Sequence, residues 1–141
     1  MQREIMTSIP FLEQPSRDAQ NTDEDFAVAQ DIKDTLDAHR NSCVGMAANM
    51  IGVSKRIIAF VDEDFGGRIF IMFNPEITAR DGAFDTSEGC LSLQRERHTV
   101  RHQRIDVTYF DRKFRERHAA FTGFTAQIIQ HEVDHCAGII I

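Results

Sequence analysis

Apolar residues first recur at a regular interval after residue 22. They return every three or four positions, which places side chains on one face of an α-helix. The repeating positions are Phe26, Ala29, Ile32, Leu36 and His39. Thr22 precedes three acidic residues and is typical of a helix N-cap. The pattern predicts a helix over residues 23–40, whose acidic positions fit a solvated face better than a binding surface. Residues 1–21 have no period and are expected to form an irregular lead-in.

Short apolar runs replace the helical period beyond residue 52. Strands are expected at 56–62, 68–73, 76–80, 83–87, 99–111 and 118–121. Turn-forming residues separate these runs at 64–67, 74–75, 81–82 and 112–115. Residues 41–52 are rich in small side chains and predict a loop whose backbone can approach another group closely. The runs together indicate an antiparallel or mixed sheet.

A second helical pattern closes the chain. It begins near Thr122 and ends before Gly138. The expected fold class is therefore α+β, with mixed or antiparallel sheets packed around a C-terminal helix and with one N-terminal helix. The length of 141 residues fits a single domain over residues 1–141.

Composition narrows the classes of function. The net charge of -6 and the pI of about 5.4 argue against a surface for nucleic acid or anionic membranes, because phosphate binding needs a basic excess. The first residues lack the pattern of a signal peptide, which favours the cytoplasm. Three cysteines in a reducing compartment are better explained as ligands or buried thiols than as disulfides.

The strongest chemical signal is the H-E-x-x-H pattern from His131 to His135. Two histidines four residues apart stack on one face of a helix, so both imidazoles can bind one metal ion. Glu132 lies beside the first histidine and can take a proton from a metal-activated water without being a ligand. The pattern is short enough to arise by chance, so a third ligand is needed.

Cys90 is the candidate for that third ligand. It lies in Glu88-Gly89-Cys90-Leu91-Ser92, between two predicted strands. Considered in isolation, a small buried thiol is the better interpretation of this residue. Together with two histidines, however, a thiolate gives a three-ligand site with an open position, which is the pattern of a catalytic metal centre.

Three motifs in this order resemble those of the peptide deformylases. Residues 88–92 and 130–135 match two of them, and residues 43–52 approach a third, Gly-rich motif that ends in Ala-Ala-x-Gln. The resemblance extends from about residue 5 to the end of the chain. It implies a metal-dependent hydrolase that removes the N-formyl group from the N-terminal methionine of nascent polypeptides.

The resemblance also implies a cofactor and a set of roles. One divalent ion, Fe²⁺ in the cell or else Zn²⁺, Ni²⁺ or Co²⁺, would be held by Cys90, His131 and His135. Glu132 would be the general base and then the acid, and the backbone N–H of Leu91 would stabilise the oxyanion. The implied partners are N-formyl-methionyl peptides or nascent chains, met transiently at the ribosome, and the expected state is a monomer without nucleic-acid or membrane binding.

Six further residues are expected to contact the substrate. Ile128 is placed by helical spacing, because it precedes His131 by three and shares its face with Phe124 and Gln127. The others come from the resemblance: Val44, Gly45, Met50, Glu88 and Arg97. In isolation, Arg97 is one of several cations in residues 95–104, a run more typical of a solvated strand surface.

Two positions depart from the family pattern. Cys43 replaces its first glycine, and Met50 replaces a glutamine whose side-chain amide donates to the oxyanion. A thioether donates no hydrogen bond. Since loss of one such donor lowers turnover by about 100- to 1,000-fold, we expect reduced activity unless Asn49 or a water molecule supplies the donor.

Two alternatives remain open on the sequence. One is a deformylase-like amidase acting on another N-formyl or N-acyl substrate. The other is a non-catalytic metal-binding paralogue, against which Glu132 argues, because metal binding alone does not require that carboxylate.

Overall fold

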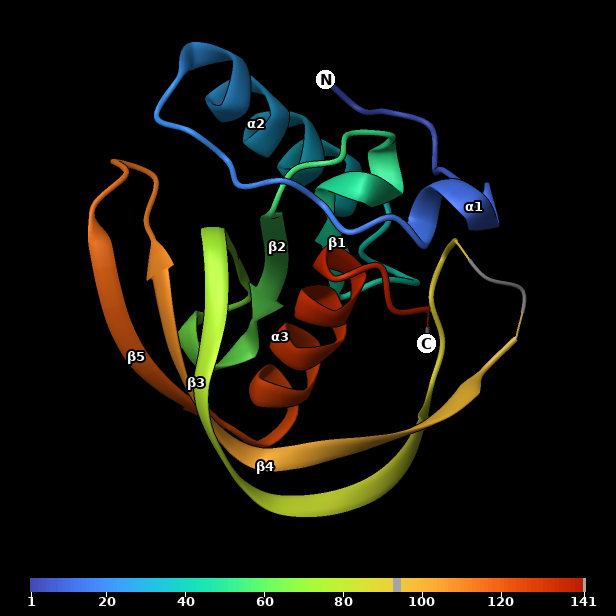
Figure 1. The fold of residues 1–141 in the computed structure, drawn as a ribbon, viewed down its shortest axis with the longest axis vertical. Coiled ribbons are helices and arrows are strands. Elements are labelled where there is room, and N and C mark those ends of the chain that lie inside the picture. The colour runs from blue at the N-terminus through green and yellow to red at the C-terminus, as the bar shows by residue number, and fades with distance from the viewer. Residues whose placement is uncertain (93–94, 141) are drawn as a thin grey trace.

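The computed structural model describes residues 1–92 and 95–140, which form one antiparallel sheet with a helix on each face. The five strands are hydrogen-bonded in sequence order, β1-β2-β3-β4-β5 (Figure 1). The elements are α1 (Ile9–Leu12), α2 (Asp23–Ala38), β1 (Gly45–Ala47), η1 (Ala48–Ile51), β2 (Ile57–Asp62), η2 (Glu63–Phe65), β3 (Arg68–Glu88), β4 (Arg97–Phe110), β5 (Glu116–Thr122) and α3 (Gly123–Cys136). The α+β prediction, with a C-terminal helix against the sheet, is confirmed.

The predicted first helix corresponds to α2. The Thr22 hydroxyl accepts from the Asp25 N–H at 3.2 Å, so the cap inferred from sequence is present. Ile32 and Leu36 are fully buried in a core cluster that includes Ile57 and Phe73. The apolar face of α2 that the sequence period predicts is therefore the face that packs against the sheet.

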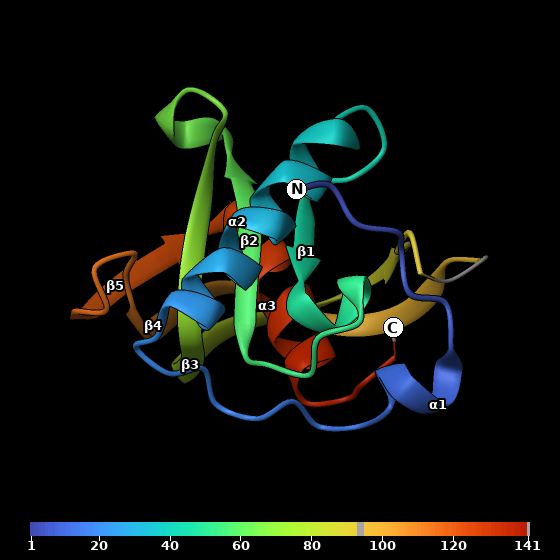
Figure 2. The ribbon, with the colours of Figure 1, turned by 90° about the horizontal axis from the view of Figure 1, so that it is seen from above.

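β2 lies between α2 and α3, and this explains its continuous apolar sequence. Its residues are all buried. Ile57, Ala59 and Val61 belong to the cluster beneath α2, whereas Ile58 and Phe60 belong to the cluster beneath α3. Successive side chains of a strand point to opposite faces, so both faces of β2 are covered. Figure 2 shows the two helices on opposite sides of this strand.

The prediction of separate strands between residues 68 and 87 is wrong, because β3 continues through both supposed turns. Asn74 has a φ of 51°, and its side chain bonds the Ala19 backbone through Oδ1 at 2.7 Å and Nδ2 at 3.0 Å. Gly82 has a φ of +74°, yet its neighbours Asp81 and Ala83 both pair with β4, so the strand does not end there. Register shifts near Phe73 and Ile77 let the long β3–β4 pair curve around α3 (Figure 1).

The predicted loop at residues 41–52 contains two short elements instead. β1 pairs antiparallel with β2, and η1 follows it directly. Gly52 ends η1 in the left-handed region, with a φ of 84°, a conformation that glycine adopts without a steric penalty. The small residues of this stretch therefore serve close packing, since residues 45–51 are buried. No helix in the described part of the chain is long and apolar enough to cross a bilayer.

Candidate metal centre and substrate cavity

α3 brings both predicted histidine ligands to one point. The Nε2 atoms of His131 and His135 are 2.9 Å apart, and both side chains are buried. Cys90 follows the end of β3, and its Sγ and the two imidazoles present ligand atoms that all lie within 4.8 Å of one another. One thiolate and two imidazoles match the donor set of a divalent transition metal, and three protein ligands leave a coordination position free. The geometry therefore fits a catalytic metal ion.

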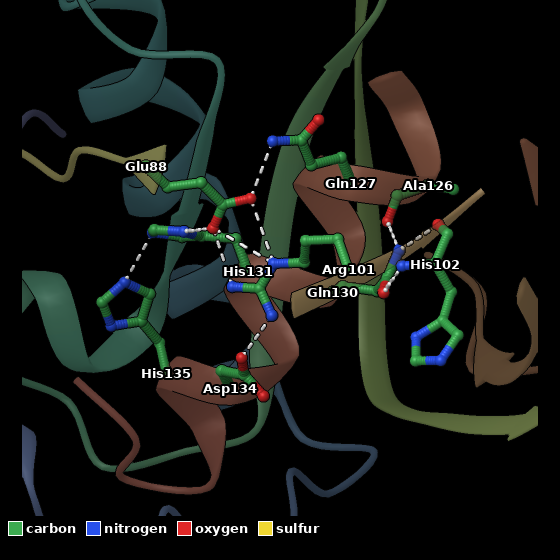
Figure 3. Close-up of polar contacts among 9 residues, drawn as sticks. All are labelled: Glu88, Arg101, His102, Ala126, Gln127, Gln130, His131, Asp134 and His135. Atoms are coloured by element: carbon green, nitrogen blue, oxygen red, sulfur yellow. Dashed lines mark hydrogen bonds and ion pairs between the residues drawn. The ribbon is translucent and has the colours of Figure 1, made fainter. Parts of the chain in front are cut away.

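Glu88 fixes the orientation of His131. Its Oε1 lies 2.7 Å from the Nδ1 of His131 (Figure 3). Because an ionised carboxylate only accepts hydrogen bonds, Nδ1 carries a proton, and Nε2 is the ring nitrogen that could bind a metal ion once it is deprotonated. Gln127 donates to the other oxygen of Glu88 at 2.8 Å. Glu88, expected from the resemblance to contact substrate, is thus bonded to the first of the two predicted histidine ligands.

Arg101 is the buried cation that sequence reasoning missed. It is 3% exposed, donates to both oxygens of Glu88 at 2.7 to 3.1 Å, and reaches Asp134 at 2.6 Å (Figure 3). A signal was present, because Arg101 has the same strand parity as Ile105, Val107 and Tyr109, all buried. Its position on the inward face ties β4 to the end of β3 and to α3.

Arg97 lies elsewhere. It is exposed at the start of β4, pairs with Glu88 only along the ladder, and is not among the residues that line the cavity. The general interpretation of residues 95–104 as a solvated strand surface describes Arg97 correctly and fails for Arg101.

A second polar contact anchors α3 to β4. The Gln130 side chain accepts from the His102 N–H at 2.8 Å and donates to the His102 carbonyl at 2.9 Å (Figure 3). This amide pairs with both backbone groups of one residue as a neighbouring strand would. Gln130, which precedes the H-E-x-x-H pattern, therefore fixes the position of α3 along β4.

The buried charges shift the titration of the two histidines in opposite directions. Burial opposes a charge on His131, but hydrogen bonds to Cys90 and Glu88 outweigh it and raise its pKa to about 10. Burial and the neighbouring charge of His131 lower the pKa of His135 to about 3. Burial likewise opposes ionisation of Glu88, yet His131, Arg101 and Gln127 hold its pKa at about 2. Glu88 thus stays negative beside the histidines.

Glu132 is a buried carboxyl group suited to proton transfer. It is 3% exposed, and its Oε1 has no hydrogen-bond partner among the described residues. Burial is the main cause that raises its pKa, to about 7. A group with a pKa near the working pH can both accept and return a proton.

Gly45 is required where β1 meets α3. A Cβ placed on Gly45 would lie 2.7 Å from the Glu132 Oε2 and 2.7 Å from the Ile128 Cγ2. Both contacts are shorter than van der Waals packing allows. The absence of a side chain lets the backbone of β1 approach the Glu132 carboxylate.

A cavity of about 460 Å³ opens beside these groups. Five of the six residues expected to contact substrate line it, and so do Cys90, Leu91, His131 and Glu132. The five are Val44, Gly45, Met50, Glu88 and Ile128. Phe124 and Gln127 also line the cavity, as the spacing from His131 predicts.

The Met50 side chain lines the cavity and also contacts the backbone of β1. Its Sδ accepts from the Ala47 N–H at 3.5 Å, and the residue is 1% exposed. Asn49 was the suggested replacement donor, but its amide donates to the His135 carbonyl at 2.8 Å, and Asn49 is not among the cavity-lining residues. Asn49 therefore holds the end of α3 and does not compensate for Met50.

Comparison with known proteins agrees with this geometry. The family model described as polypeptide deformylase matches residues 3–141. The peptide deformylase of Clostridium beijerinckii is 49% identical over 141 residues, covering 100% of both chains. A Legionella pneumophila peptide deformylase structure is 29% identical, with a TM-score of 0.89 over 99% of this chain and 83% of that one. An Acinetobacter baumannii peptide deformylase with Met-Ala-Ser bound is 26% identical, with a TM-score of 0.86 over 99% and 96%. On the fold, the motifs and these matches, the chain belongs to the polypeptide deformylase family.

Proposed function

We propose that this chain hydrolyses the formyl amide at the N-terminal methionine of newly made polypeptides. The observation that carries the proposal is the buried Glu132 carboxylate, whose Oε1 has no partner among the described residues. It lines one cavity together with Cys90 and His131 of the Cys/His/His ligand set. The solved Acinetobacter baumannii relative, which holds Met-Ala-Ser, supports a peptide with an N-terminal methionine as the ligand class.

Cys90, His131 and His135 would hold the metal ion, for which we propose Fe²⁺, with Zn²⁺, Ni²⁺ or Co²⁺ as replacements. When bound, the ion supplies a Lewis acid that activates water and polarises the formyl carbonyl. Glu88 and Arg101 keep the His131 ring in the orientation that ligation needs. Proton competition at His131 makes loading of the site dependent on pH.

Glu132 carries the proton through the reaction. It removes a proton from the water that attacks the formyl carbon, and then delivers it to the departing amine as the C–N bond breaks. The products are formate and a polypeptide with a free α-amine. The N–H of Leu91, next to Cys90 in the cavity wall, would stabilise the oxyanion.

The substrate would reach the site from the cytosol, transiently at the ribosome where new chains emerge, and the enzyme would act as a monomer. An extended peptide fits β1, because this strand lies at the end of the sheet order and, among the described strands, pairs with β2 alone. Addition of a strand to such an edge is a general mode of peptide recognition.

Met50 favours a second candidate, an amidase for another N-acyl group, because the amide donor of the family is missing. A direct comparison separates the two. Protein purified without oxygen is analysed for metal, and formate release from formyl-Met-Ala-Ser is compared with acetate release from acetyl-Met-Ala-Ser. We expect formate release that disappears in Glu132→Gln while the bound metal stays. Formate release that survives this substitution would overturn the role of Glu132, and faster acetate release would favour the second candidate.

A further inference from the structure

The outer edge of β1 presents backbone groups toward the cavity side. The Val61 N–H donates to the Val44 carbonyl at 2.8 Å, so the backbone of Val44 points toward β2. Backbone groups alternate in direction along an antiparallel strand. Those of Gly45 and Ala47 therefore point away from β2, toward the edge where an extended peptide would add.

Two sulfur side chains occupy these outward groups. The Cys43 Sγ donates to the Gly45 carbonyl at 2.9 Å, and the Met50 Sδ accepts from the Ala47 N–H at 3.5 Å. Cys43 and Met50 are also the two positions at which the sequence departs from the family motif. Both departures thus have the same structural consequence: a side chain of this chain bonds a backbone group at the outer edge of β1.

The two contacts differ in what a ligand can reach. Ala47 is 1% exposed and is not among the residues lining the cavity. Gly45 and Cys43 both line it. Only the contact between Cys43 and Gly45 therefore stands where a bound peptide would place its own N–H.

We propose that Cys43 is a specificity-determining residue whose thiol holds the Gly45 carbonyl in the free enzyme and must release it when a peptide pairs with β1. This inference rests on the proposed function, since it assumes an extended peptide in the cavity. The thiol is a weak donor, so it fills the place of the peptide N–H without blocking it permanently. Cys43 raises the KM and leaves the chemical step unchanged.

The state of the thiol is consistent with this role. Burial, followed by the negative charge of Glu132, raises the pKa of Cys43 to about 12. The group therefore remains a neutral donor throughout the physiological range. The same shift makes it a poor nucleophile, so a covalent function is not needed to explain its position.

The test is a cycle that combines two variants with altered substrates. Cys43→Ala removes the donor, and Cys43→Ser keeps one at the same place. Formate release is measured with formyl-Met-Ala-Ser and with peptides that are N-methylated at one residue at a time. Thermal unfolding and metal content show whether each variant is folded and loaded.

We expect Cys43→Ala to lower the KM for formyl-Met-Ala-Ser by about 2- to 5-fold at constant kcat, the size of one modest hydrogen bond. Cys43→Ser should keep the KM of the unaltered enzyme or exceed it. For one N-methylated peptide, the advantage of Cys43→Ala should disappear, because that peptide has no N–H to donate. An equal KM advantage for every N-methylated peptide would overturn the proposal, and so would a higher KM in Cys43→Ala.

Failure of the proposed function gives a different result. If the unaltered, metal-loaded protein releases no formate, the proposed function is refuted. In that case the same variants are compared by their dissociation constants for formyl-Met-Ala-Ser and its N-methylated forms, measured by calorimetry. A difference between Cys43→Ala and Cys43→Ser that depends on the peptide N–H would still support the role of Cys43, and its absence would refute it.

Discussion

Replacement of Met50 by glutamine should accelerate the enzyme. Met50 lines the cavity, and its Sδ already accepts from the Ala47 N–H. A glutamine at this position has an oxygen that can accept the same N–H and an amide NH₂ that remains free to donate into the cavity. The residue is 1% exposed, so existing packing would hold the new donor in place.

The size of the gain follows from two limits. A well-placed oxyanion donor contributes about 100- to 1,000-fold to turnover, which sets the upper limit. An ordinary neutral hydrogen bond contributes about 1 kcal/mol, or roughly 5-fold, which sets the lower limit. We expect Met50→Gln to raise kcat by about 10- to 100-fold and to change KM by less than about 2-fold, because the donor acts mainly on the transition state.

The assay is formate release from formyl-Met-Ala-Ser with metal content and thermal unfolding measured on the same samples. Met50→Leu is the matched control, because it conserves the volume but has neither donor nor acceptor. Its rate should stay within about 2-fold of the unaltered enzyme, and its stability should fall by about 1 kcal/mol as the Ala47 N–H loses its partner. If folded, metal-loaded Met50→Gln turns over no faster than the unaltered enzyme, Met50 does not limit oxyanion stabilisation.

Three other changes test the site. Gly45→Ala places a Cβ 2.7 Å from Glu132 Oε2 and Ile128 Cγ2. The kcat/KM should therefore fall at least ~10-fold, and the free energy of unfolding in urea should fall by about 1–3 kcal/mol. Unchanged values would mean that α3 can shift to accommodate the added methyl group. The pKa of Glu88 is lowered to about 2 from the usual 4.5, so this carboxylate stabilises the fold above pH 4.5 and the contribution is lost as the pH falls toward 2. Glu88→Gln should therefore lower the stability of the metal-free protein by roughly 3 kcal/mol at pH 7 and flatten its acid dependence, whereas exposed Glu76→Gln should do neither. Removal of the metal by a chelator should lower the Tm, and re-addition should restore it, because the ion binds the folded state; an equal Tm in both forms would argue against the ligand set.

The two long helices, α2 and α3, could be predicted from sequence because their signals are local, whereas the short helix α1 lies in the stretch that was expected to be irregular. Thr22 caps α2 as expected, and Ala29, Ile32 and Leu36 of the apolar period form its buried face, with Phe26 half-buried at its start. The apolar runs predicted where strands occur, but not that three of the predicted strands are one continuous strand, β3. The supposed turn at residues 74–75 is a point where β3 bends while Asn74 binds Ala19, which lies 55 residues earlier in the chain. Turn-type residues predict a local conformation, and a distant partner decided whether the strand ended there.

The candidate site divides in the same way. His131, Glu132 and His135 follow from helical spacing, and Cys90 follows from its motif, so the chemistry could be expected from short segments alone. The positions of Arg101 and Asn49 could not, because each depends on a group brought near by packing. Arg101 is buried against Glu88 by the curved pairing of β3 with β4, and Asn49 meets the His135 carbonyl across 86 residues. The Cys43 thiol reaches a carbonyl only two residues away, but the direction of that carbonyl depends on how β1 pairs with β2. Spacing along a helix determines which ligands share a face, whereas hydrogen-bond partners between distant segments exist only once the sheet and helices have packed.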